Sequence, residues 1–349
     1  MAGAVYDLTT LLPVLQVQKT LPSFWLKYFP STVTFDTDEI AFDKVWTDNR
    51  RLAPFVVPNV QGRVSGLSGY ETRTLKVAYI KDKNVLDYTL PFKRMAGENL
   101  STGSMSPEAR RMALIGQMLA DQKQRLTNRF EWLAAKAVID GKVTISGEDY
   151  PSTLVDFRRH ANLTITLTGA AKWDQATGAP LTNLKAARVE SNYRSGARIT
   201  TCVFGATAWD LLTTRVDLRA QMQTQIDGYG TRVSMMADGY EGYEYMGVIQ
   251  GLDGSGRLEC WVNTAKYVDD TGAEQFVQDQ STVVGVSRDS LRGFRCFGAI
   301  KDKNAQFRAL EMFPKVWEEE DPAVEFMMTQ SAPLMVPGDP NASFSIKVA

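Results

Sequence analysis

A single helical pattern dominates the middle of the chain, and from Ser106 to Gly141 it reads SPEARRMALIGQMLADQKQRLTNRFEWLAAKAVIDG. Ser106 is a typical N-cap, Pro107 suits the first helical position, and Gly141 follows the last turn. Apolar residues recur at steps of three, four or seven, at Met112, Ile115, Leu119, Leu126, Phe130, Leu133 and Ala137. Charged residues, Glu131 among them, are expected on the other faces. A helix of about 34 residues extends about 50 Å, so we expect it to lie across a sheet as the backbone of the fold.

The segment before this helix has an extended pattern. Between Pro58 and Gly97 the residues alternate in character, with polar residues at 81–84 that favour a turn. The pattern predicts a two-stranded ribbon whose turn lies at Lys81 to Asn84. Arms of roughly 12 to 15 residues would reach about 40 to 50 Å, and a lone hairpin is marginally stable in water. We therefore expect a neighbouring copy of the chain to cover the ribbon. A smaller hairpin is predicted from Val33 to Val45.

Composition excludes several classes of protein. The chain has 349 residues, 44% of them hydrophobic and 23% charged, and a formal net charge of -1. A surface devoted to nucleic acid would need a basic excess. The sequence has neither a run of 18 apolar residues nor a leader pattern, which predicts a cytosolic chain without a membrane anchor. Three cysteines far apart, Cys202, Cys260 and Cys296, fit buried packing better than disulfides or a metal site.

Shorter elements follow between residues 162 and 305 and predict a mixed α/β domain. A strand at Ile199 to Phe204 precedes a helix predicted from Thr207, as N-cap, to Gln225. Further strands are predicted at 243–249, 258–262, 267 with 276 around the turn Asp269 to Gly272, and 282–286. In the tail, residues 324–329 and 343–348 alternate, which predicts two strands in the sheet under the long helix.

Catalytic patterns are sparse, and we predict no catalytic, cofactor-binding or metal-binding residue. His160 is the sole histidine and lies beside Arg158 and Arg159, so a solvated or structural role is favoured over catalysis. The acidic run from Glu318 to Asp321 lacks the alternating ligands of a calcium loop and is typical of a solvated face. A metabolic enzyme with His160 or this run in a cleft is kept as an alternative.

Opposite charges at two places give candidate contacts between subunits. Basic residues concentrate on the predicted ribbon, and the acidic run could receive them from another copy. Edge protection of exposed strands explains the basic residues equally well. The candidate contact residues are Arg63, Arg73, Lys76, Lys81, Lys83, Glu318, Glu319 and Glu320.

Several short motifs occur in a particular order along the chain. They are Phe55-Val-Val-Pro58 with Gly62, the long helix leading into Gly141-Lys-Val-Thr-Ile-Ser-Gly-Glu148, and in the tail Asp321-Pro-Ala, Gln330-Ser-Ala-Pro-Leu-Met335 and Asp339-Pro340. Together with the order of elements, they resemble the major capsid proteins of tailed bacteriophages, which have the Hong Kong 97-like fold. Within that group the chain is similar to the phage lambda major head protein family. The resemblance runs nearly end to end.

The resemblance implies an α+β fold with four parts. These are an N-terminal arm with a small hairpin (1–57), an extended loop (58–97), a peripheral domain with the spine helix and returning strands (98–161 and 306–349), and an axial domain (162–305). It implies a structural protein, not an enzyme, that assembles as pentamers and hexamers into an icosahedral head around double-stranded DNA. Expected partners are a scaffold, a portal and, as in some relatives, a decoration protein. No cofactor or membrane is expected. The expected location is the virion capsid, after assembly in the host cytoplasm.

Two questions stay open at the level of sequence. A bacterial nanocompartment shell has the same fold and would enclose an enzyme in place of DNA. Some relatives of the wider fold also join a loop lysine to an asparagine of a neighbour. Lys76, Lys81 and Lys83 are candidate amines for such a crosslink. The resemblance to the lambda branch, which relies on decoration, argues against it.

Overall fold

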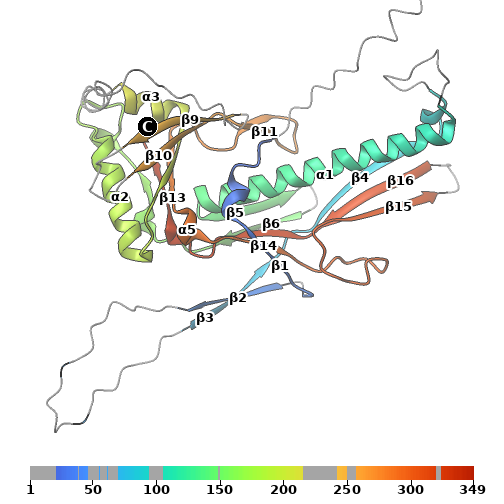
Figure 1. The fold of residues 1–349 in the computed structure, drawn as a ribbon, viewed down its shortest axis with the longest axis horizontal. Coiled ribbons are helices and arrows are strands. Elements are labelled where there is room, and N and C mark those ends of the chain that lie inside the picture. Colours follow the sequence, from blue (N-terminus) through green and yellow to red (C-terminus); the bar gives the residue numbers. More distant parts are fainter. Residues whose placement is uncertain are drawn as a thin grey trace, which may run out of the picture.

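The computed structural model describes residues 21–37, 39–45, 55, 61, 70–93, 105–147, 150–214, 242–249, 257–319 and 324–349. Figure 1 shows a long helix lying along a narrow sheet, a mixed α/β unit at one end of that helix, and a two-stranded ribbon that projects from the body. Both the helix and the ribbon extend well beyond a compact core. This elongated arrangement agrees with the prediction that the helix is the backbone of the fold.

The long helix is α1, Pro107–Ile139, and its predicted ends are confirmed. The side-chain oxygen of Ser106 accepts a hydrogen bond from the backbone N–H of Ala109 at 3.2 Å, as an N-cap does. After the helix the backbone of Gly141 adopts a φ of 66°, a left-handed conformation that glycine adopts without strain. A Cβ atom at this glycine would lie 2.9 Å from the Cβ of Arg159, so the site also excludes larger residues.

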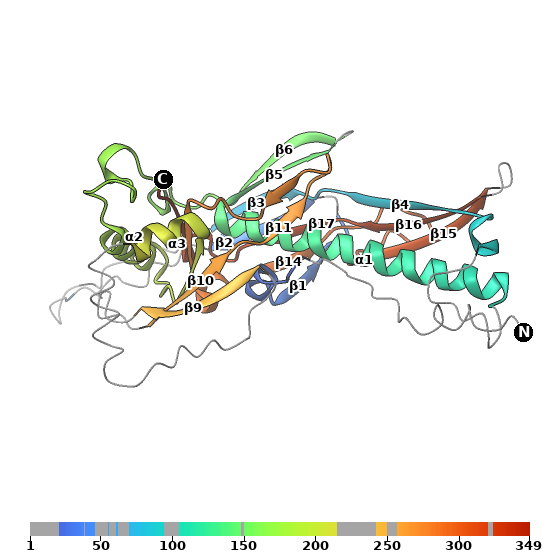
Figure 2. The same cartoon turned by 90° about the horizontal axis from the view of Figure 1, so that it is seen from above.

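A three-stranded antiparallel sheet lies along α1 (Figure 2), in the order β15-β16-β4. Its strands are β15 (Phe313–Glu319), β16 (Val324–Ser331) and β4 (Ile80–Asp87). The turn predicted at Lys81 to Asn84 is therefore wrong, because these residues lie inside β4 and pair with β16. Their polarity has another cause. One face of β4 meets polar groups of α1 and the other face is exposed, so the strand carries charges without being a turn.

The projecting ribbon consists of β2 (Glu39–Val45) and β3 (Tyr70–Lys76), which pair antiparallel over their whole length. The two strands predicted within 58–97 thus exist, but they pair with different partners instead of each other. The small hairpin predicted from Val33 to Val45 is also wrong. Its first strand, β1 (Ser31–Thr34), pairs in parallel with β14 (Phe294–Phe297), so the chain bends near Asp36 and passes from one sheet to another.

The mixed α/β unit contains a six-stranded sheet in the order β7-β18-β13-β8-β10-β9. Its strands are β7 (Thr164–Thr166), β18 (Ser343–Lys347), β13 (Thr282–Val286), β8 (Thr201–Gly205), β10 (Leu258–Asn263) and β9 (Tyr243–Ile249). The predicted strands of this region are confirmed. The tail strand β18 was expected under the long helix, but it pairs with β13 and β7.

Among the described residues, α2 and α3 are the longer helices of this unit. The sequence did not predict α2, Pro180–Ser195. The other helix, α3, spans Ala206–Thr213 and begins after Gly205, so the predicted N-cap at Thr207 is wrong. The end predicted for this helix at Gln225 lies outside the described residues.

The remaining described elements are short. They are η1 (Trp25–Tyr28), η2 (Leu90–Phe92), β5 (Lys142–Gly147), β6 (Tyr150–Asp156), η3 (Ala161–Leu163), η4 (Gly169–Ala171), β11 (Lys266–Val268), β12 (Glu274–Phe276), α5 (Arg288–Leu291), β17 (Pro333–Val336) and η5 (Pro340–Ala342). Strands β11 and β12 form the predicted hairpin around Asp269 to Gly272. Strand β17 pairs antiparallel with β14 and completes the sheet that contains β1.

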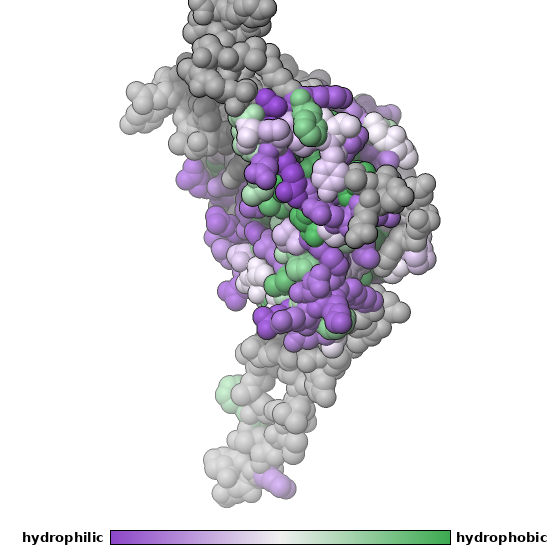
Figure 3. Space-filling model, turned by 90° about the vertical axis from the view of Figure 1, so that its right-hand side faces the viewer, coloured by the Kyte–Doolittle hydropathy of each residue, from purple (hydrophilic) through white to green (hydrophobic). Residues whose placement is uncertain are grey.

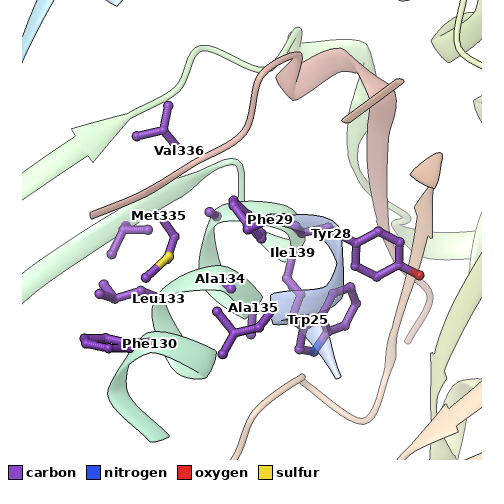
Figure 4. Packing of buried hydrophobic residues seen from close by; sticks show 14 of the residues in the cluster. Trp25, Tyr28, Phe29, Phe130, Leu133, Ala134, Ala135, Ile139, Met335 and Val336 are labelled. Carbon is purple, nitrogen blue, oxygen red and sulfur yellow. The ribbon is translucent and has the colours of Figure 1, made fainter. Parts of the chain in front are cut away.

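The largest core surrounds the C-terminal half of α1. Figure 4 shows side chains of this half, among them Phe130 and Leu133, packed with residues of η1 and β17 such as Trp25 and Met335. The predicted apolar stripe is buried here, at Leu126, Phe130, Leu133 and Ala137. In the N-terminal half it is not, since 68% of Met112 and 37% of Leu119 are exposed. That half of the helix makes polar contacts with the sheet, beside the buried side chains of Leu86 and Met327.

Candidate assembly surfaces

The sheet β15-β16-β4 has one face turned away from α1. Val85, Phe326 and Trp317 lie in one row across the three strands. The rings of Trp317 and Phe326 stack with their centroids 5.4 Å apart. The ammonium of Lys83 lies 3.6 Å from the centroid of Phe326 and 5.3 Å from that of Trp317, within the range of a cation–π contact. We call this surface the lysine–aromatic face, formed by Lys81, Lys83, Val85, Lys315, Trp317 and Phe326.

The opposite face of the sheet meets α1 through a buried polar network. Gln122 of α1 donates from Nε2 to the carbonyl oxygens of Asp82 and Met327, each at 3.2 Å, and its Oε1 accepts from the hydroxyl of Thr329. Toward the start of α1, Arg111 forms two 2.8 Å bonds with the buried carboxylate of Glu325. Glu325 and Thr329 are buried while Phe326 is partly exposed, so the polar side of β16 faces the helix.

The structure separates the predicted contact residues. Lys81 and Lys83 lie on the lysine–aromatic face, and alternation along β15 places Glu319 on the same side. Glu318 lies on the helix side, 3.3 Å from Arg111 of its own subunit, in a pair that is mostly exposed. Arg73 and Lys76 belong to β3 of the ribbon. Arg63 and Glu320 lie outside the described residues. Contact between these groups of different subunits stays a prediction.

His160, the candidate catalytic residue, makes hydrogen bonds that support the local fold. The Nδ1 atom of His160 accepts a hydrogen bond from the backbone N–H of Asn162 at 3.2 Å, which caps η3. The backbone N–H of His160 donates to Oδ1 of Asn341 at 2.9 Å.

In the described ranges, no group of three or more His, Cys, Asp or Glu residues could hold a metal ion. The helices of these same ranges include none that is long and apolar enough to cross a membrane.

The three cysteines are buried, as the sequence predicts. Burial raises the pKa of the Cys260 and Cys296 thiols to about 12 and raises that of Cys202 as well. A thiol reacts as its thiolate. Their positions therefore fit packing and give no nucleophile near neutral pH.

A buried carboxylate joins α1 to the N-terminal segment, and the sequence did not predict it. Glu131 was expected on a charged face, yet its side chain is fully buried. It accepts hydrogen bonds from the backbone N–H groups of Phe24 (2.8 Å), Trp25 (2.5 Å) and Leu26 (2.9 Å). These donors lie at the start of η1, so Glu131 clamps η1 to α1. Burial raises the pKa of Glu131 to about 7, although the three N–H groups and Lys27 act in the opposite direction.

This clamp makes subunit stability depend on pH. The folded state holds the carboxyl at a pKa of about 7, against an ordinary value of 4.5, so it binds the proton more tightly than the unfolded state. The contribution of Glu131 to the free energy of unfolding should therefore fall as pH rises. Between pH 5.5 and 8 the expected loss is about 2 kcal/mol. Chemical unfolding of the wild-type chain and of Glu131→Gln at both pH values measures the loss. A difference between the two proteins that does not change with pH would contradict it.

Comparison with known proteins identifies the family of this chain. The model of the family described as "Phage major capsid protein E" matches residues 7–348. The chain belongs to this family. It is 31% identical over 339 residues to the major capsid protein of Enterobacteria phage P21, with 92% of each protein covered. It is 27% identical over 335 residues to the major capsid protein of Escherichia phage lambda, with 94% of each covered.

Solved structures agree with this assignment. A protein assigned as a capsid protein of a prophage in Escherichia coli CFT073 has 26% identity and a TM-score of 0.67, with 95% of this chain and 94% of that chain covered. The capsid structure of cyanophage P-SCSP1u has 10% identity and a TM-score of 0.52, and shows the shared fold alone. The Hong Kong 97-like α+β fold predicted from the sequence is thus confirmed, and the chain is a shell-forming major capsid protein of a phage head. The nanocompartment alternative is not favoured.

Proposed function

We propose that this major capsid protein assembles as pentamers and hexamers into an icosahedral head that encloses double-stranded DNA. The observation that carries the proposal is the ribbon of β2 and β3, which pair with each other and project from the body (Figure 1). Two strands alone are marginally stable in water. A neighbouring subunit that covers the ribbon would supply the missing packing, and repetition of that contact around an axis builds a shell.

The lysine–aromatic face is the surface that we propose for this contact. It combines an exposed apolar residue, Val85, which is 51% exposed, with stacked aromatic rings and lysine side chains. By sequence the two ribbon strands carry three carboxylates, of Glu39, Asp43 and Glu71, and three cations, of Lys44, Arg73 and Lys76, so the ribbon has no net charge. We propose that its carboxylates meet those lysines. Phe55, in the segment between β2 and β3, is fully exposed and would gain from burial against a neighbour.

The division into domains follows from the same proposal, with one change from the sequence. We propose that the extended loop includes β2 as well as β3 and ends before β4. It then spans about residues 39–76 in place of 58–97, because β2 pairs with β3, whereas β4 pairs with β16 in the sheet that lies along α1. The peripheral domain would contain α1 and the sheet β15-β16-β4. The axial domain would contain the six-stranded sheet, including β18, which comes from the tail.

Many weak contacts suit a shell that must close correctly before it becomes permanent. Figure 3 views the end of the molecule at which α1 begins, where hydrophilic residues predominate and hydrophobic residues are scattered. Polar contacts of this kind are individually weak and reversible. The near-zero net charge limits repulsion between copies. Partners proposed for this chain are a scaffold, a portal and a decoration protein, with assembly in the host cytoplasm and maturation to the virion capsid.

A charge reversal on the lysine–aromatic face tests the proposed contact. Lys83→Glu combined with Trp317→Ala should leave the subunit folded, because both side chains lie on the exposed side of the sheet. It should lower the yield of closed shells at least tenfold, since the neighbour's carboxylates would meet a negative charge. Negative-stain electron microscopy counts the shells, and circular dichroism checks the fold.

The matched control is Lys185→Glu, which makes the same charge change on an exposed position of α2. It should assemble like the wild-type chain. Normal shells from the Lys83→Glu/Trp317→Ala variant, with the fold intact, would show that the ribbon binds elsewhere.

A further inference from the structure

A basic hollow lies where η1, β1 and α5 meet. Its lining is formed by Lys27, Pro30, Arg288, Asp289 and Arg292, around a volume of about 350 Å³. Three of these side chains carry a positive charge and one carries a negative charge, so the formal charge of the lining is +2. None of these residues belongs to the ribbon or to the lysine–aromatic face. The shell contacts proposed above therefore do not account for the cluster.

Lys27 and Arg288 lie close enough for their positive charges to repel each other. Burial and the charge of Arg288 lower the pKa of Lys27 to about 8, while Glu259 and Glu131 partly offset this. The ammonium of Lys27 also lies 3.5 Å from the centroid of the Phe24 ring, which fixes its position. The charged form of a lysine whose pKa is lowered in this way is stabilised when an anion binds beside it.

A hydrogen bond and close packing fix the backbone around the hollow. Gly293, directly after Arg292, donates its N–H to the carbonyl oxygen of Tyr28 at 2.9 Å, so the two walls are joined. A Cβ atom at Gly293 would lie 2.3 Å from the Phe29 ring, which requires glycine there. Arg292 has a φ of 39°, in the left-handed region that non-glycine residues seldom adopt. This residue is the left-handed C-cap that ends α5, so its conformation fixes the point at which the helix stops.

We propose that this hollow binds a phosphate group. A lining charge of +2 matches a phosphate dianion better than a single carboxylate, and the guanidinium groups of Arg288 and Arg292 have the planar donor geometry that phosphate oxygens favour. The phosphate can come from inorganic phosphate or from the backbone of DNA. The two sources share the same chemistry at the site, and an experiment separates them.

The reactivity of Lys27 toward an acylating reagent reports occupancy of the site. A pKa of about 8, against 10.5 for an ordinary lysine, leaves far more of Lys27 unprotonated at pH 8, so Lys27 should be acylated preferentially. A bound phosphate group should raise the pKa of Lys27 by at least one unit, which lowers its acylation rate about fivefold. Mass spectrometry of the full-length chain measures the rate after addition of inorganic phosphate, of a short DNA duplex, or of chloride at equal ionic strength.

The outcomes are distinct. Protection by inorganic phosphate alone identifies a free ion as the ligand. Protection by the duplex at phosphate concentrations where the ion has no effect identifies the DNA backbone. In both cases Arg292→Gln should lose the protection, and Lys185→Gln, an equal charge change on α2, should keep it. The proposal is wrong if neither probe protects Lys27 more than chloride does, or if Arg292→Gln is protected as well as the wild-type chain.

Discussion

Replacement of Arg159 by alanine is expected to lower the free energy of unfolding of the subunit by about 3 to 5 kcal/mol. The buried guanidinium donates to the carbonyl oxygens of Val138 at 2.7 Å and Ile139 at 2.8 Å, in the last turn of α1. It also donates to the hydroxyl of Thr164 at 2.9 Å. Alanine would leave the two buried carbonyl oxygens without this donor and create a cavity. Arg159 is only 9% exposed, and this burial lowers its pKa to about 10.

Urea unfolding followed by circular dichroism measures the effect. Arg158→Ala is the matched control, because the neighbouring side chain is exposed and its truncation should change the free energy of unfolding by no more than about 0.5 kcal/mol. Arg159→Lys should fall between the two, since an ammonium cannot reproduce the planar fork. Equal stability of Arg159→Ala and the control would show that the end of α1 does not depend on this cap.

Replacement of Phe130 by alanine should cost about 3 to 5 kcal/mol of subunit stability. Phe130 is 3% exposed and packs edge-on against Phe297 of β14, with ring centroids 5.5 Å apart. Its truncation would leave a cavity between α1 and this sheet. Thermal unfolding compares the variant with Leu119→Ala, on the same helix but largely outside the core, which should lose less than about 1 kcal/mol. An unchanged melting profile for Phe130→Ala would place this side chain outside the core.

The sequence predicts local features well, because their causes lie within a few residues. The N-cap at Ser106 and the glycine at 141 determine the ends of α1 through contacts with neighbouring turns. Strand pairing has no such local cause. Residues 81–84 look like a turn in isolation, and their partners lie more than 240 residues later in β16. In the same way β1 finds its partner in β14, far along the chain.

Helix α2 and the buried Glu131 were not predicted, because both place polar side chains in the core. Helix α2 buries Arg188 and Ser191 beside Leu184 and Ala187, so its core side shows little apolar periodicity. Its start also lacks a capping side chain, and the glycine at its end, Gly196, with a φ of 69°, was the available signal. Glu131 gave no signal either, because a lone charge among apolar residues usually points to solvent.

The candidate surface was predicted in part. The excess of basic residues on 58–97 identified Lys81 and Lys83, which lie on the lysine–aromatic face. The aromatic half of that face comes from Trp317 and Phe326, which only the pairing of β15, β16 and β4 brings beside the lysines. A sequence pattern cannot indicate that proximity.

Electron cryomicroscopy of particles assembled from the full-length chain tests most directly whether neighbouring copies complete the subunit. The expected map shows closed icosahedral shells of pentamers and hexamers, in which the β2–β3 ribbon of each subunit lies on the lysine–aromatic face of the next. Particles that remain single subunits, or shells in which the ribbon packs against its own subunit, would contradict the account.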